Sequence, residues 1–398
     1  MVRGALSGVM VLDLTHHIAG PYCTRLLAGM GADVVKVEKP GVGDVARGIG
    51  PFPNDEPHLE RSGLFLYLNA NKKSITLNLK TATGVKIFKE LVKDADVIVE
   101  NFEPRVMLDL GLDHEILSKI NPRLVVTSIS NFGQTGPYRD YKATEVVALA
   151  VSGLMYITGA FDREPLKYGL SQGQYIAGSV GASATLSALL AREEAEVGQH
   201  VDVSIMESIM QGMMMHIAYY SHTGAVMRRT PKVRAATDEI MATKDGYIAP
   251  IFHGFLDWGL MASFLQCPEL DDPKFHSDAG RRIFASELNA ILAPVIAQWG
   301  KHELFHAAQE WRLPFGVVQT PEDLVRCPQL KDRGYFVEMD HPVAGRLTYP
   351  GAPFKMSETP WQAERPAPLL GEHNEEIYCG RLGYSKQDLV ILKERGII

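Results

Sequence analysis

The first 130 residues of the chain alternate short apolar runs with segments of helical periodicity. Residues 9–15 predict a buried strand, and residues 20–32 predict a helix with Pro21 in its first turn and Gly31 at its end. The alternation continues with strands at 33–40, 74–79, 96–101 and 124–130 and helices at 82–95 and 106–120. Strands that alternate with helices predict an α/β fold with a parallel, Rossmann-like sheet covered on both faces.

Beyond residue 130 the pattern predicts mainly helices and then a change of domain. Residues 144–191 are helical and rich in small residues, and a strand at 200–208 precedes a methionine-rich helix at 209–220. These methionines are expected to pack in the core or at a subunit interface, or to line a flexible ligand pocket. Three segments are predicted: the N-terminal part of a large Rossmann-like domain at 1–223, a small α+β domain with a basic linker at 224–330, and C-terminal strands with a proline-rich arm returning to the large domain at 331–398.

The composition of the chain is typical of a globular enzyme and argues against several other classes of protein. The 398 residues are 46% hydrophobic and 22% charged, as in ordinary globular enzymes. A net charge of -7 argues against a nucleic-acid partner. The four cysteines form no C-x-x-C pair, so neither a zinc site nor a disulfide framework is predicted. Because no apolar run reaches the ~18 residues of a membrane span and the N-terminal apolar run is only strand-length, we expect a cytoplasmic protein without signal peptide or membrane partner.

Candidate ligand-binding residues follow the predicted strands. The loop 15–21 lies after the first strand, where α/β sheets bind ligands, and carries His16 and His17; it lacks the G-x-G-x-x-G of dinucleotide sites. Basic residues at the ends of predicted strands suit, taken together, a polyanionic nucleotide such as the ADP part of coenzyme A: Lys39, Arg47, Lys72 and Lys73. Asn101 and Phe102 end another strand and could hold an adenine or a pantetheine arm. Each of these residues also has a structural interpretation, as a solvated charge or as loop packing.

Several segments together resemble the family III coenzyme A transferases, a group that includes formyl-, carnitine- and benzylsuccinate-CoA transferases and the related α-methylacyl-CoA racemases. The resemblance runs nearly end to end, through "VLDLTHHIAGPYCTRLLAGMGADVVKVEKPGVGD", "NANKKSITLNLKTATG", "ADVIVENFEP", "INPRLVVTSISNFGQTGPY", "EVGQHVDVSIMES" and "APLLGEHN". It implies two interlocked, ring-shaped chains that use coenzyme A or an acyl-CoA as substrate, with no permanently bound cofactor and no metal.

The resemblance also implies site residues. Glu145 is expected near the reacting thioester, and CoA contacts are implied at His16, Ala19, Lys39, Asn71, Lys73, Asn101, Phe102 and Lys142. Two departures affect the phosphate contacts. This chain reads "NFEPR" where many relatives read "NFRPG", and Asp109 stands where a basic residue is common.

A greater departure lies in "GLSQGQYIAG", residues 169–178. In family transferases the matching turn reads Gly-Asp, and the aspartate attacks the thioester to form a mixed anhydride. That position falls on Gln174, and an amide is a poor nucleophile, so this chain alone is expected to be inactive. The racemase acid–base pair is also missing, because Thr144 and Gln174 stand where its histidine and aspartate would be.

Three hypotheses follow. The preferred one is a non-catalytic subunit of a hetero-oligomeric family III CoA-transferase, paired with a homologous chain that carries the aspartate; two-subunit members exist among the benzylsuccinate-CoA transferases. The second is an active CoA-ester lyase, isomerase or hydratase that uses Glu145 or His17 for proton transfer. The third is a CoA-ester-binding protein with a structural or regulatory role.

Overall fold

The computed structural model describes residues 4–229, 240–250 and 258–398. The chain divides into two compact units. Unit 1 comprises Met1–Ile157, Leu166–Met227 and Asp332–Ile398, and unit 2 comprises Thr158–Pro165 and Arg228–Lys331. Most of the basic linker predicted at the start of the small domain lies outside the described residues.

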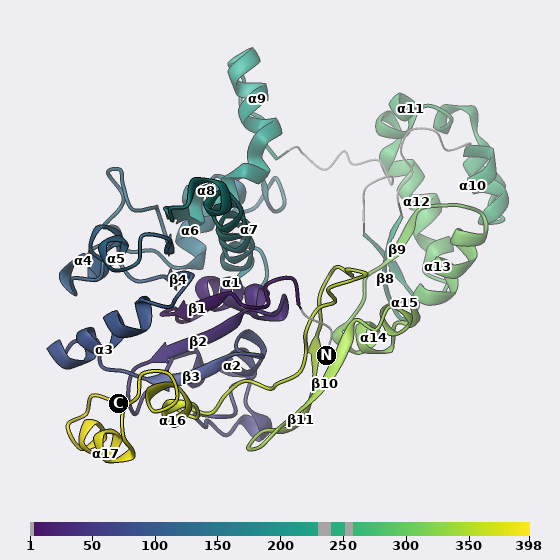
Figure 1. Ribbon diagram of the computed structural model, residues 1–398. Helices are drawn as coiled ribbons and strands as arrows, with labels where there is room; N and C mark the ends of the chain where they lie inside the picture. The colour runs from purple at the N-terminus through teal and green to yellow at the C-terminus, as the bar shows by residue number, and fades with distance from the viewer. Residues whose placement is uncertain (1–3, 230–239, 251–257) are drawn as a thin grey trace. The chain divides into compact units, whose positions relative to one another are not determined.

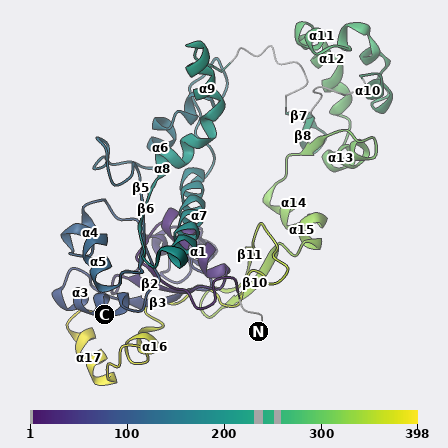
Figure 2. The same cartoon turned by 45° about the horizontal axis from the view of Figure 1, so that its top comes forward.

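Unit 1 is built on a six-stranded sheet in the order β3-β2-β1-β4-β5-β6, and every neighbouring pair is parallel (Figures 1 and 2). The strands are β1 (Met10–Asp13), β2 (Asp33–Glu38), β3 (Lys73–Thr76), β4 (Val97–Glu100), β5 (Val125–Ser130) and β6 (His200–Ser204). The predicted α/β fold with a parallel, Rossmann-like sheet is therefore confirmed. The strand order reverses between β1 and β4, and the crevice outside the carboxyl ends of those strands is where such sheets bind ligands.

Successive strand residues enter two separate cores, one on each face of the sheet. Val11 and Val97 pack with α1 (Ala19–Gly29) and α7 (Gln172–Ala195), whereas Leu12 and Ile98 pack with the other cluster of helices. The second group is α3 (Ala82–Val92), α5 (His114–Ile120), α16 (Asn374–Tyr378) and α17 (Lys386–Glu394) (Figures 1 and 2). A Cβ at Gly178 would lie 2.6 Å from the Ala19 carbonyl oxygen, so glycine permits the close contact of α7 with α1.

Two predicted helices differ from the structure. The helix expected at 106–120 is two helices, α4 (Val106–Asp109) and α5, because Gly111 takes a φ of 64° and Asp113 caps α5 by accepting from the Ile116 amide. The methionine-rich segment is divided into α8 (Ile205–Met210), a short 3-10 turn and α9 (Met214–Thr223).

Helix α9 buries none of its residues and projects from the rest of unit 1 (Figures 1 and 2). Met214 and Met215 are 67% and 68% exposed. The prediction of core packing is therefore wrong for these two methionines. Their packing at a subunit interface stays a prediction.

The remaining elements of unit 1 are α2 (Gly63–Leu68), α6 (Glu145–Val151), several short 3-10 turns and the antiparallel hairpin β10 (Phe336–His341) with β11 (Gly345–Pro350). Unit 2 contains the antiparallel sheet β7 (Met241–Thr243), β8 (Gly246–Pro250) and β9 (Phe315–Val317). Its helices are α10 (Trp258–Phe264), α11 (Asp278–Ile283), α12 (Ala285–Ile296), α13 (Lys301–Glu310) and α14 (Pro321–Arg326), and α15 (Pro328–Asp332) follows. Among the described residues no helix has the length and apolar character needed to span a membrane.

Candidate active site

Two adjoining cavities open in unit 1 at the carboxyl ends of its strands. The first has a volume of about 300 Å³ and the second about 740 Å³. Both are lined by His16, Val45, Phe102 and Val106, so they meet at these four residues. The two cavities therefore form the crevice that the strand order predicts, and together they are large enough for an extended small molecule.

The loops after β1 and β4 are joined where the two cavities meet. The His16 amide donates to Asn101 Oδ1 at 2.9 Å, and Asn101 Nδ2 donates to the His16 carbonyl at 2.8 Å. The rings of His16 and Phe102 lie 5.6 Å apart. Burial lowers the pKa of His16, so its ring is neutral near pH 7. Three predicted site residues are thus brought together by two strands that lie far apart in the sequence.

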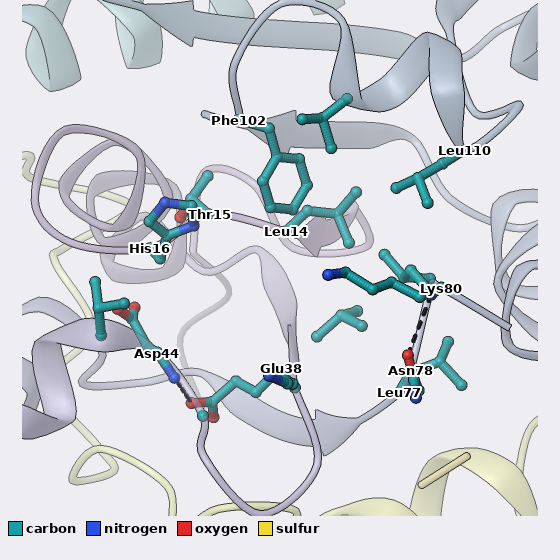
Figure 3. Close-up of a pocket in the computed structure, with 16 residues that line it drawn as sticks. Leu14, Thr15, His16, Glu38, Asp44, Leu77, Asn78, Lys80, Phe102 and Leu110 are labelled. Atoms are coloured by element: carbon teal, nitrogen blue, oxygen red, sulfur yellow. Dashed lines mark hydrogen bonds between the residues drawn. The ribbon is translucent and has the colours of Figure 1, made fainter. Parts of the chain in front are cut away.

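The first cavity is largely apolar with basic residues at its edge. Its apolar walls are Leu14, Val37, Leu77, Leu79, Phe102, Val106 and Leu110. Lys39 lines the cavity as predicted from the sequence, and the Lys80 side chain points into it in Figure 3. Neither lysine forms an ion pair within the described part of the chain. The sequence reading missed Lys80, although it follows a predicted strand just as Lys39 does.

The inner end of the second cavity holds Gln174 and Glu145. Gln174 lies in the first turn of α7 and is only 8% exposed. The Gly173 amide donates to Glu145 Oε1 at 2.8 Å, whereas Oε2 of the same carboxylate is buried without a hydrogen-bond partner among the described residues. A Cβ at Gly173 would approach Ile209 Cδ1 to 2.6 Å, so a larger residue here would require the Ile209 side chain to shift. The amide of Gln174 and a carboxylate with one free oxygen therefore line the same cavity.

The outer part of the second cavity is lined by charged side chains that are mostly paired. Lys142, a predicted CoA contact, forms an ion pair with Glu103. Arg105 and Arg139 both contact Asp140, and Asp109 also lines this part of the cavity.

A buried charge network fixes the loops that form the site. Lys36 Nζ lies 2.8 Å from Asp44 and donates to the Thr15 carbonyl at 2.6 Å. Asp44 in turn accepts from the amide of His17, which has a φ of 69°. Burial alone would raise the pKa of Asp13, but Lys36 and Lys72 lower it to about 2. These buried charges hold the loops after β1 and β2 in place.

Two basic residues predicted as phosphate contacts belong to this network instead. Lys72 is 1% exposed, and its ammonium donates to Asp13, the Pro21 carbonyl, Thr24 and Asn69. Arg47 is fully buried against Glu38 and Glu60. The prediction is wrong for both, because their donors are used within the chain.

Three other predicted CoA contacts line neither cavity. Asn71 accepts from the amides of Glu364 and Arg365 and donates to the Gln362 carbonyl, so it fastens the C-terminal arm. Lys73 lies 2.9 Å from carboxylate oxygens of both Asp33 and Glu376. Ala19 is buried at the start of α1. CoA contacts at these three positions stay predictions.

Glu100 lies at the end of β4, directly before Asn101. Its Oε2 accepts from the Phe102 amide at 2.9 Å, and the side chain is 3% exposed. Burial raises the pKa of Glu100 to about 7, against hydrogen bonds from Ser128 and Phe102 that lower it. In the folded chain its neutral form therefore predominates below about pH 7.

Replacing Glu100 by glutamine is expected to stabilise the protein more at pH 8 than at pH 5. Wild-type Glu100 ionises in the unfolded chain near its ordinary pKa but resists ionisation when folded, so stability falls as the pH rises toward 7 and stays reduced above it. The difference is on the order of 2 kcal/mol, or about 4–8 °C in thermal midpoint. Melting both proteins at the two pH values tests this; an equal difference at both would contradict it.

A Rossmann-like sheet with a two-part cavity at its switch point defines a class of proteins that bind small, nucleotide-like ligands. The chain belongs to CoA-transferase family III, whose family model matches residues 6–374. Members of this family use CoA thioesters as substrates.

Three similar proteins illustrate the match. A succinyl-CoA:glutarate CoA-transferase of Mus musculus is 33% identical over 99% of this chain and 90% of its own length. A formyl-CoA:oxalate CoA-transferase of Streptomyces avermitilis is 34% identical over 99% of each chain. The crystal structure of a CaiB/BaiF family protein from Brucella suis is 29% identical, covers 95% of this chain and 99% of its own, and has a TM-score of 0.86.

Proposed function

We propose that this chain is the nucleophile-lacking subunit of a heteromeric family III CoA-transferase. The complex moves CoA from an acyl-CoA such as succinyl-CoA to a carboxylic acid such as benzylsuccinate. We take as its model the succinyl-CoA:(R)-benzylsuccinate transferase of anaerobic toluene degradation, which has an aspartate-lacking subunit. Related transferases exchange CoA among small carboxylic acids, which supports this substrate class.

The observation that carries the proposal is the amide of Gln174 at the inner end of the second cavity. Transfer through a mixed anhydride needs a carboxylate oxygen that attacks the thioester carbon while the C–S bond breaks and the CoA thiolate leaves. An amide oxygen is a far weaker nucleophile. Neither Gln174 nor Thr144, which also lines the cavity, can supply the nucleophile or the racemase acid–base pair.

The two cavities support retention of CoA binding. The apolar first cavity, with Lys39 and Lys80 at its edge, suits an adenosine with its 3′-phosphate, because the walls contact the base and the lysines neutralise the phosphate. The second cavity continues to Glu145 and Gln174 and can hold the pantetheine arm and the thioester.

The exposed helix α9 supports the proposal that a partner chain binds unit 1. Ile217, Tyr219 and Tyr220 are at least 43% exposed, as are Met214 and Met215. An apolar helix without buried residues is typical of a surface that another chain covers. We propose that a homologous subunit carrying the aspartate covers it, in an interlocked heterodimer or a larger hetero-oligomer.

The test is expression of this chain alone and together with a homologous chain that carries aspartate at the position of Gln174. The isolated chain is expected to transfer CoA from succinyl-CoA to benzylsuccinate no faster than the uncatalysed reaction, and the pair is expected to transfer it readily. The homologous chain expressed alone is the control. Robust transfer by the isolated chain would overturn the proposal, as would a pair no more active than the homologous chain alone.

A second candidate function rests on Glu145. Glu145 lines the cavity, and its buried Oε2 has no hydrogen-bond partner among the described residues, so the carboxylate is available as a general base or acid in a CoA-ester lyase, isomerase or hydratase. This candidate needs turnover of an acyl-CoA by the isolated chain. Glu145→Gln would then have to abolish that turnover, whereas Gln174→Asn would leave it unchanged.

A further inference from the structure

Two arginines in the outer part of the second cavity share one carboxylate. Arg105 Nε and Nη2 donate to Asp140 at 3.2 and 2.9 Å, and Arg139 Nε and Nη2 donate to it at 3.1 and 3.0 Å. All three residues line the cavity. Arg105 precedes α4 and Arg139 lies in the loop after β5, so Asp140 holds guanidinium groups from two separate segments side by side. We call Arg105 and Arg139 the arginine fork.

The fork has unused positive charge and unused donors. Two guanidinium groups face one carboxylate, which leaves one positive charge in excess. Both arginines bind Asp140 through Nε and Nη2, so the Nη1 amino group of each has no partner within the described residues. The side chains are 62% and 33% exposed and can be reached by a ligand. Asp140 therefore orients the fork without neutralising it.

No other cationic side chain among the described residues that line the second cavity has both excess positive charge and free hydrogen-bond donors. Lys142 is paired one-to-one with Glu103, and Asp109 adds a negative charge nearby. An anion that enters this part of the cavity is attracted to the arginine fork and repelled by the unpaired carboxylate.

We propose that Arg105 and Arg139 bind the 5′-diphosphate of the CoA thioester. This assignment rests on the proposed function, because it takes a CoA ester as the ligand. Arg105 directly precedes Val106, which lines both cavities, so the fork lies near the junction between them. The diphosphate of CoA joins the adenosine, which suits the first cavity, to the pantetheine arm, which runs toward Glu145 and Gln174. Planar guanidinium groups match two phosphate oxygens at once, so the fork suits a diphosphate better than two lysines would.

The experiment is calorimetric titration of the full chain, alone and with its homologous partner, with CoA and with 3′-dephospho-CoA. The Arg105→Ala/Arg139→Ala variant is expected to bind both ligands about 10- to 100-fold more weakly than wild type, by the same factor for each. Arg105→Lys/Arg139→Lys keeps the charge but loses the paired geometry, so an intermediate loss is expected. Arg326→Ala is the matched control, because Arg326 is an exposed arginine that pairs with Glu322 and lines neither cavity.

The outcomes separate this assignment from the proposed function. A loss confined to CoA, with 3′-dephospho-CoA unaffected, would place the 3′-phosphate at the fork and overturn the assignment. Unchanged binding of both ligands by the double alanine variant would overturn it as well, while leaving the subunit role intact. If the wild-type chain binds neither CoA nor 3′-dephospho-CoA, whether alone or with its homologous partner, both the subunit role and the diphosphate assignment fail. If the isolated chain proves to be an active transferase but the fork variant loses affinity for both ligands equally, only the subunit role fails.

Discussion

Gln174→Asp is expected to give the isolated chain CoA-transferase activity at least about 10³-fold above that of wild type. Removal of a covalent nucleophile elsewhere costs up to about 10⁶-fold in kcat, so restoring one can return a large part of that factor if the rest of the site is intact. Gln174 lies in the first turn of the 24-residue helix α7, whose amino end favours negative charge and so offsets part of the cost of placing a carboxylate there. The measurement is conversion of succinyl-CoA and benzylsuccinate to succinate and benzylsuccinyl-CoA.

Gln172→Asp is the matched control for this prediction. It adds the same carboxylate two residues earlier in the same helix, but Gln172 is exposed and lines neither cavity. Gln174→Asn, which shortens the side chain without adding a charge, is the second control. Activity in Gln174→Asp alone would indicate an intact site around a missing nucleophile. Equal inactivity of all three variants, with CoA still bound, would show that more than the nucleophile has been lost.

The same substitution is expected to reduce stability. Glu145 accepts a hydrogen bond from the amide of Gly173, the residue before Gln174, and its second oxygen is buried without a partner in the described chain. A second carboxylate beside it would be repelled by that charge and partly desolvated. The neutral amide of Gln174 avoids both costs, so a subunit released from catalysis can keep glutamine here at a gain in stability.

The sequence pattern predicted the parts of the site that follow directly from strand order. His16, Asn101 and Phe102 come immediately after buried strands, and parallel strands bring such residues to one edge of the sheet. Lys39, Glu145 and Gln174 line the cavities at the same edge. The strands themselves were predictable because both faces of the sheet are covered, so each reads as a short continuous apolar run.

The fate of individual charges was not predictable in the same way. Lys72 and Lys73 stand at the start of β3 and Lys80 lies beyond its end, yet Lys72 is buried, Lys73 is paired, and Lys80 points into the first cavity (Figure 3). These lysines have different environments because their ion-pair partners lie far away in the sequence: Asp13 pairs with Lys72, and Glu376 pairs with Lys73. A periodicity argument contains no information on such pairs. The expected single helix at 106–120 failed for a local reason, because the positive φ of Gly111 ends α4 there.

Asp13→Asn is expected to destabilise unit 1 by about 3–5 kcal/mol, because it removes the carboxylate that faces two fully buried ammonium groups. Lys72 Nζ lies 3.0 Å and Lys36 Nζ 3.9 Å from Asp13 Oδ2, and all three side chains are fully buried. Lys36 retains Asp44, whereas Lys72 keeps only neutral acceptors. Burial already lowers the pKa of Lys72 to about 8, so without Asp13 its charge is costlier still, and the loss is expected to widen as the pH falls through about 8 toward the acid range in which Asp13 itself becomes protonated.

A double-mutant cycle with Lys72→Met tests whether the loss comes from the unpaired charge. Removing Lys72 in the Asp13→Asn background is expected to recover part of the stability, because a buried ion pair can be replaced by uncharged groups at much lower cost than it can be broken. Calorimetric melting of the full chain provides the measurement, and Glu338→Gln is the control, since Glu338 pairs with Arg346 on the exposed hairpin β10–β11 and its loss should change little. If the two single substitutions were simply additive, the charge network would not be what fixes the loops after β1 and β2. The positions of His16 and His17 would then have to depend on the hydrogen bonds to Asn101 and Asp44 alone.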